Sequence, residues 1–152
     1  MGQSTDAYLF YGYCWDDEDT EFSTDMSETV KAILVERGHA DPWDGCPDGG
    51  DYRAYRAAHE SEFARYRELE KQVEEELGVD WDSHCSDGCP MPLLFVRGTK
   101  TTAWRGSPRP VTSIDVDPAW KPKLDAFLES QGIEPPSSGE NQPGWWVASW
   151  WG

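Results

Sequence analysis

The two ends of the chain are apolar and rich in aromatic residues, and this feature most constrains the fold. The segment Ala7–Trp15 consists mainly of aromatic and aliphatic residues, and Gly144–Trp151 carries four of the nine tryptophans. Aromatic and aliphatic residues favour strands. Successive side chains of a strand point to opposite faces, so both faces of each segment are apolar. Strands that are apolar on both faces lie inside a sheet. We therefore predict that the first and last strands are central neighbours.

Three further segments have strand-like composition. Pro92–Arg97 is aliphatic and aromatic, and Gly98 permits a turn into a threonine-rich partner strand at Thr99–Arg105. Val111–Val116 is predicted as another short strand.

Helical periodicity appears between the strands. Apolar residues recur at steps of three and four in the ranges Met26–Arg37, Tyr52–Leu77 and Lys121–Gln131, each followed by a glycine stop. The middle range predicts one continuous helix about 40 Å long. The sequence thus predicts an α+β fold in a single domain of residues 1–152. Its mainly antiparallel sheet has about four strands, the N- and C-terminal strands are central, and three helices, including one long helix, pack against the sheet.

The charge of the chain excludes several classes of partner. It has 13 Lys and Arg residues against 29 Asp and Glu, a formal net charge of −16. Direct nucleic-acid binding and binding to an anionic membrane both need a cationic face, so neither is expected. There is no apolar run long enough for a membrane span and no signal-peptide pattern at the start. We expect a soluble intracellular protein.

The negative charge is concentrated near the start. Residues 1–51 contain 13 acids and two bases, and five of those acids lie within Asp16–Glu21 without a base between them. A calcium loop is excluded because counting from Asp17 places Phe22 where the loop requires glycine. Two interpretations remain: a solvated loop, or a surface that docks on a basic partner or imitates nucleic-acid phosphates. The partner-binding hypothesis assigns Trp15, Asp16, Asp17, Glu18, Asp19 and Glu21.

The four cysteines are too scattered for a strong metal motif. A structural zinc site needs two close pairs of ligands, and the available candidates are Cys46, His84, Cys85 and Cys89. Cys46 has no neighbouring cysteine, and Cys14 lies in the first strand as a small core residue. Reduced thiols are favoured over zinc, and a disulfide requires an oxidising compartment. We predict no cofactor, with zinc as the alternative.

The chain also carries four distinctive segments: M-G-Q-S-T-D-A at the start, L-F-Y-G-Y-C-W-D from Leu9 to Asp16, R-G-H-A-D-P-W-D from Arg37 to Asp44, and P-G-W-W-V-A-S-W-W-G from Pro143 to Gly152. In these segments the chain resembles a group of small acidic proteins encoded by tailed phages of actinobacteria. The resemblance implies a phage gene product made in the host bacterial cytoplasm, and it transfers no catalytic residue.

Function is predicted from charge and from this resemblance. The sequence has no phosphate-binding glycine loop, no G-x-S-x-G elbow and no H-E-x-x-H. The leading hypothesis is a non-catalytic accessory protein that binds a basic surface of a host or anti-phage defence protein, with nucleic-acid mimicry as one form of it. The alternatives are a small metal- or carboxylate-dependent enzyme acting on a small molecule or nucleotide, and a minor virion component.

Overall fold

The computed structural model describes residues 5–15, 26–86, 89–136 and 142–151, and it has the predicted α+β class. The chain divides into two compact units. The sheet unit comprises Met1–Ser23 and Leu77–Gly152, and the helical unit comprises Thr24–Glu76. The assignment of residues 1–152 to a single domain stays a prediction.

The sheet unit is built on five strands and one helix. Its elements are β1 (Thr5–Cys14), β2 (Val79–Ser86), β3 (Cys89–Val96), β4 (Thr101–Ala103), α4 (Trp120–Ser130) and β5 (Gly144–Trp151). The strand order is β3-β2-β5-β1-β4, and β3 also pairs with β1. The β2–β5 pairing is parallel and the other pairings are antiparallel. The sheet is therefore mixed rather than purely antiparallel.

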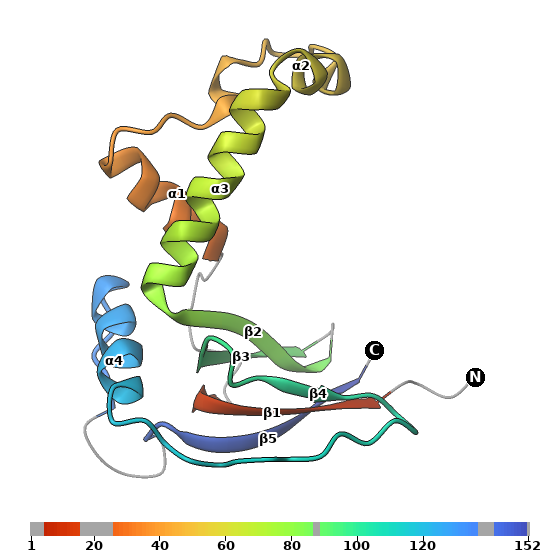
Figure 1. The fold of residues 1–152 in the computed structure, drawn as a ribbon, viewed down its shortest axis with the longest axis vertical. Helices are drawn as coiled ribbons and strands as arrows, with labels where there is room; N and C mark the ends of the chain where they lie inside the picture. The colour runs from red at the N-terminus through yellow and green to blue at the C-terminus, as the bar shows by residue number, and fades with distance from the viewer. Residues whose placement is uncertain (1–4, 16–25, 87–88, 137–141, 152) are drawn as a thin grey trace. The chain divides into compact units, whose positions relative to one another are not determined.

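The two terminal strands are neighbours, as predicted. β1 and β5 pair from Thr5↔Trp151 to Gly12↔Gly144 (Figure 1). On its other side β1 pairs with β4 near its start and with β3 near its end, so β1 is central. The pairings β1–β3, β3–β2, β2–β5 and β5–β1 close a ring.

The core follows from alternation along these strands. On one face of β1, Phe10 packs with Leu93, Phe95 and Ala148. On the other face, Tyr11 contacts Trp120 at 5.0 Å between ring centroids, and Tyr13 donates a hydrogen bond of 2.6 Å to Asp125 of α4. Both faces of β1 are thus covered, which is why the segment is apolar on both sides.

The helical unit contains four helical elements. They are α1 (Met26–Glu36), the 3₁₀ helix η1 (Pro42–Gly45), α2 (Tyr52–Ala58) and α3 (Glu60–Leu77), whose last residue belongs to the sheet unit. The buried side chains of the unit come from α1 and α3: Val30, Leu34, Phe63, Tyr66 and Val73. The guanidinium of Arg37, the residue after α1, lies 2.7 Å from the Glu76 carboxylate of α3.

The prediction of one long helix over Tyr52–Leu77 is wrong, because the helix breaks at His59. The residue has φ −113° and ψ 26°, outside the helical region. Its ring stacks on Tyr55 at 4.4 Å between ring centroids, and Nδ1 lies 3.2 Å from the Glu62 carboxylate. Its carbonyl accepts hydrogen bonds from the amides of Glu62 and Phe63, which begin the next helix. His59 is therefore the residue at which α2 ends, and its carbonyl accepts hydrogen bonds from the first turn of α3.

The strand predictions also need correction. The segment Thr99–Arg105, predicted as the partner of Pro92–Arg97, contains β4, which pairs with β1 instead. β2 was not predicted, because Asp80 and Asp82 are disfavoured in strands; in the structure Arg97 and Lys100 pair with these carboxylates. The segment Val111–Val116 forms no strand, and its apolar side chains are exposed. In the described residues, each helix is too short or too polar to cross a membrane.

Candidate functional site

Trp15, the first residue of the predicted partner-binding site, is held in place at the end of β1. Its amide donates to the Pro92 carbonyl at 3.2 Å, and its carbonyl lies 2.9 Å from His84 Nε2. Its ring lies 5.5 Å from that of Tyr13 and 6.0 Å from that of Trp81. The other predicted residues, Asp16, Asp17, Glu18, Asp19 and Glu21, lie outside the described residues. The acidic run therefore starts at a fixed point on the sheet unit.

His84 contacts a cysteine that is distant in sequence. Cys14 Sγ lies 3.5 Å from His84 Nε2, the same nitrogen that contacts the Trp15 carbonyl. A carbonyl oxygen only accepts, so Nε2 carries the hydrogen in that bond. A nitrogen that donates has no lone pair free to take the thiol proton. In this geometry His84 holds Trp15 rather than acting as a base toward Cys14.

The zinc candidates are divided between the two units, and one of them is not fully described. His84 and Cys85 belong to the sheet unit and Cys46 to the helical unit, while the side chain of Cys89 lies outside the described part. Cys85 has φ +80°, a strained value for a residue with a Cβ. Among the described side chains, no three His, Cys, Asp or Glu residues converge as metal ligands.

Sequence reasoning missed an arginine-rich hollow on the helical unit. This arginine pocket has a volume of about 300 Å³, and it is lined by Arg53, Arg56, Ala57, Glu60, Phe63 and Arg67. The three guanidiniums have no ion pair with any described residue, although the chain as a whole is strongly acidic. Arginine is the side chain best suited to bind phosphate and carboxylate groups. The pocket brings three exposed guanidiniums and one carboxylate together, and the charge of Arg67 also acts on the nearby Glu70.

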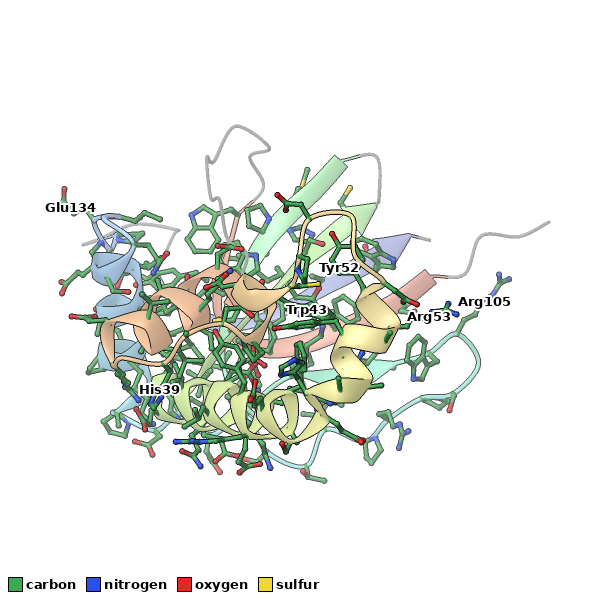
Figure 2. The ribbon with its side chains drawn as sticks, turned by 90° about the horizontal axis from the view of Figure 1, so that it is seen from above. His39, Trp43, Tyr52, Arg53, Arg105 and Glu134 are labelled. Atoms are coloured by element: carbon green, nitrogen blue, oxygen red, sulfur yellow. The ribbon has the colours of Figure 1, made fainter. Side chains whose placement is uncertain are left out.

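A second hollow shares a wall with the first. This aromatic pocket has a volume of about 200 Å³, and it is lined by Asp41, Pro42, Trp43, Arg56, Phe63, Tyr66, Arg67 and Glu70. Trp43 of η1 packs on Phe63 at 4.6 Å between ring centroids, and 40% of its surface remains exposed. The ring of Trp43 also lies 6.0 Å from that of Tyr52 of α2 between ring centroids, and both residues are labelled in Figure 2. The two pockets share Arg56, Phe63 and Arg67.

One buried hydroxyl in the aromatic pocket has no partner. Tyr66 is 8% exposed, and its hydroxyl oxygen makes no hydrogen bond with the described residues. Burial, then the negative charges of Asp41 and Glu70, raise the pKa of Tyr66, so it stays protonated and able to donate. Buried polar groups without a partner are rare in native proteins. Tyr66 thus lines the aromatic pocket with a hydroxyl hydrogen that the described residues do not use.

Asp41 and Glu70, the two carboxylates of the aromatic pocket, differ in how neighbouring groups shift their pKa values. Burial opposes ionisation of Asp41, but hydrogen bonds from Lys31 and the Trp43 amide lower its pKa. The Lys31 ammonium lies 2.8 Å from this carboxylate, so Asp41 is already engaged. For Glu70, burial followed by the charges of Glu74 and Asp41 raises the pKa. Glu70 is the carboxylate that remains available as an acceptor.

Only the break at His59 brings the arginines together. In a continuous helix the Cα atoms of Arg53 and Arg67 would lie about 21 Å apart along the axis. The bend turns α2 away from the axis of α3 (Figure 1), so that residues of both helices line one hollow. The available signal in the sequence is that residues 52–67 contain four arginines and two glutamates in a chain dominated by acids.

Comparisons of the chain with protein families, with curated proteins and with solved structures found no match.

Proposed function

We propose that this chain is a phage-encoded, non-catalytic accessory protein that binds a basic surface of a host or anti-phage defence protein in the bacterial cytoplasm. The binding surface is the acidic run of Asp16, Asp17, Glu18, Asp19 and Glu21 together with Trp15. The observation that carries the proposal is that five carboxylates without an intervening base directly follow a residue fixed to the sheet.

The anchoring of Trp15 supports this role. A partner that binds a run beginning at a fixed residue orders less chain than one that binds a free tail, so less conformational entropy is lost on binding. Trp15 is also half-buried at the end of β1. An aromatic residue beside charged residues is typical of energetically important positions in interfaces.

Half of the cations of the sheet unit pair with carboxylates of β2 and α4. Arg97 pairs with Asp80, Lys100 with Asp82 and Lys121 with Asp125. These are three of the six Lys and Arg residues in that unit. Negative potential of the acidic run therefore attracts cations of another molecule, and such attraction raises the association rate at low salt.

The test is affinity capture from a host lysate at low salt with a charge-matched control. One variant neutralises the run with Asp16→Asn, Asp17→Asn, Glu18→Gln, Asp19→Asn and Glu21→Gln. The control removes the same charge from exposed positions elsewhere, with Glu28→Gln, Glu36→Gln, Glu68→Gln, Glu129→Gln and Glu134→Gln. We expect the original chain and the control to capture the same protein and the run variant to lose it.

Competition with duplex DNA tests the mimicry form of the proposal. If the acidic run occupies a nucleic-acid-binding surface, DNA added to the lysate displaces the captured protein. Equal capture by the run variant and the original chain would remove the acidic run from the mechanism.

A further inference from the structure

We propose that the helical unit binds a nucleoside monophosphate, with the phosphate in the arginine pocket and the base in the aromatic pocket. The two hollows share the side chains of Arg56, Phe63 and Arg67. One ligand with an anionic end and a planar end therefore fills both. This proposal rests on residues 41–70 and is independent of the acidic run.

The phosphate end is assigned by charge. Arg53, Arg56 and Arg67 line the arginine pocket, and Glu60 is the carboxylate among its lining residues. Guanidinium groups bind phosphate through paired, charge-assisted hydrogen bonds. Because none of the three has an ion pair with a described residue, a phosphate does not have to displace an internal carboxylate.

The base end is assigned by the aromatic residues. Trp43 packs on Phe63 and stays 40% exposed, so it offers ring surface to a second planar group. Bases stack on aromatic side chains with a gain of about 1–3 kcal/mol for each base. Two carboxylates, Asp41 and Glu70, line this pocket beside the shared guanidiniums, whereas the arginine pocket has three guanidiniums and one carboxylate. The balance of charge therefore favours the arginine pocket for the phosphate.

Two polar groups remain for the edge of the base. The Tyr66 hydroxyl is buried without a partner among the described residues and donates to a ring nitrogen or carbonyl. The Glu70 carboxylate accepts from a ring N–H or amino group. Guanine presents a carbonyl acceptor and N–H donors along one edge. Guanosine monophosphate is therefore the probe.

The first experiment measures binding of guanosine monophosphate to the full chain by titration calorimetry at low salt. Guanosine and inorganic phosphate serve as separate probes for the two pockets. We expect the nucleotide to bind at least tenfold more tightly than either part, because it occupies both hollows. Equal affinity for inorganic phosphate and nucleotide would reduce the site to an unspecific cationic patch and overturn the proposal.

The arginines are tested by a charge-matched pair of variants. Arg56→Gln with Arg67→Gln removes two guanidiniums from both hollows, whereas Arg65→Gln with Arg109→Gln removes the same charge from exposed positions that line neither. We expect the first variant to weaken nucleotide binding at least about tenfold for each guanidinium lost. The control should stay within a factor of about two. Equal weakening in both variants would contradict the assignment.

Tyr66→Phe separates ligand binding from folding. The hydroxyl has no hydrogen bond with described residues, so its removal should not lower the thermal unfolding temperature. We expect nucleotide binding to weaken about five- to tenfold while inorganic phosphate binding is unchanged. Unchanged nucleotide affinity in this variant would show that the base does not reach Tyr66 and would refute its placement in the aromatic pocket.

Discussion

At the scale of single residues, the clearest buried polar contact joins β1 to α4. The Tyr13 hydroxyl donates to Asp125, and the Lys121 ammonium lies 2.5 Å from the same carboxylate. Burial is the main cause that raises the pKa of Tyr13, and the hydrogen bond and charge of Asp125 add to it. The contact keeps Tyr13 protonated in the folded chain to higher pH than in the unfolded chain.

This raised pKa predicts a loss of stability in alkali. The contribution of Tyr13 is complete below pH about 10, the ordinary pKa of tyrosine, and it is lost as pH rises toward the folded-state pKa. We expect Tyr13→Phe to lower the free energy of unfolding by about 1–2 kcal/mol at pH 7 and to flatten its fall above pH 10. Urea denaturation over pH 7–11 measures both effects. The control Tyr52→Phe alters an exposed side chain and should leave the curve unchanged.

At the scale of elements, close approach of β1 and β3 explains a glycine within a central strand. A Cβ on Gly12 would lie 2.0 Å from the Leu94 carbonyl oxygen and 2.6 Å from the Phe95 Cα. Both are backbone atoms, and backbone atoms cannot move aside by changing a side-chain rotamer. The Gly12 carbonyl also accepts a hydrogen bond of 2.9 Å from Trp146 Nε1. The β1–β3 pairing therefore depends on the absence of a side chain here.

Gly12→Ala should accordingly destabilise the sheet unit. We expect a loss of about 3 kcal/mol or more, at the upper end of the range for overpacked positions, because two strands must move apart. Gly144, the partner of Gly12 across the β1–β5 pairing, has open space around its Cβ position and provides the matched control. The shift of the urea midpoint measures the loss. A similar shift in Gly12→Ala and Gly144→Ala would show that strand propensity, not steric contact, sets the cost.

At the scale of the whole molecule, the net charge of −16 makes self-repulsion a general cost of folding. Three of the seven described ion pairs have both side chains exposed, and such pairs contribute about 0–1 kcal/mol each. Salt weakens these pairs and the general repulsion alike. Because acids outnumber bases by more than two to one, relief of repulsion should exceed the loss from the pairs.

The unfolding temperature should therefore rise with salt. We expect an increase of a few degrees between about 0.01 M and about 0.5 M sodium chloride, since the screening length falls from about 30 Å to below 10 Å. Thermal unfolding followed by circular dichroism at pH 7 measures it. The variant with five exposed glutamates changed to glutamine should show a smaller rise. A fall in unfolding temperature with salt would mean that the ion pairs outweigh the repulsion.

The sequence by itself determined the central position of the two terminal strands and the helix ends at Gly38 and Gly132. Both faces of Ala7–Trp15 and most of Gly144–Trp151 are apolar, which favours a position inside the sheet. β1 is covered on both faces, whereas Val147 of β5 is 76% exposed. The predicted stops at Gly38 and Gly132 both have positive φ, which closes the preceding helix. These features depend on neighbouring residues alone, so a linear pattern contains them.

Only the tertiary structure decided β2, the contacts of His84 and the arginine pocket. Asp80 and Asp82 are tolerated in a strand because Arg97 and Lys100 pair with them, and Cys14 contacts His84 across 70 positions of sequence. The break at His59 escaped detection because apolar steps of three and four continue through it. A periodic pattern records which side of each helical segment is buried, whereas a change of axis direction depends on the contacts that a single residue makes in three dimensions.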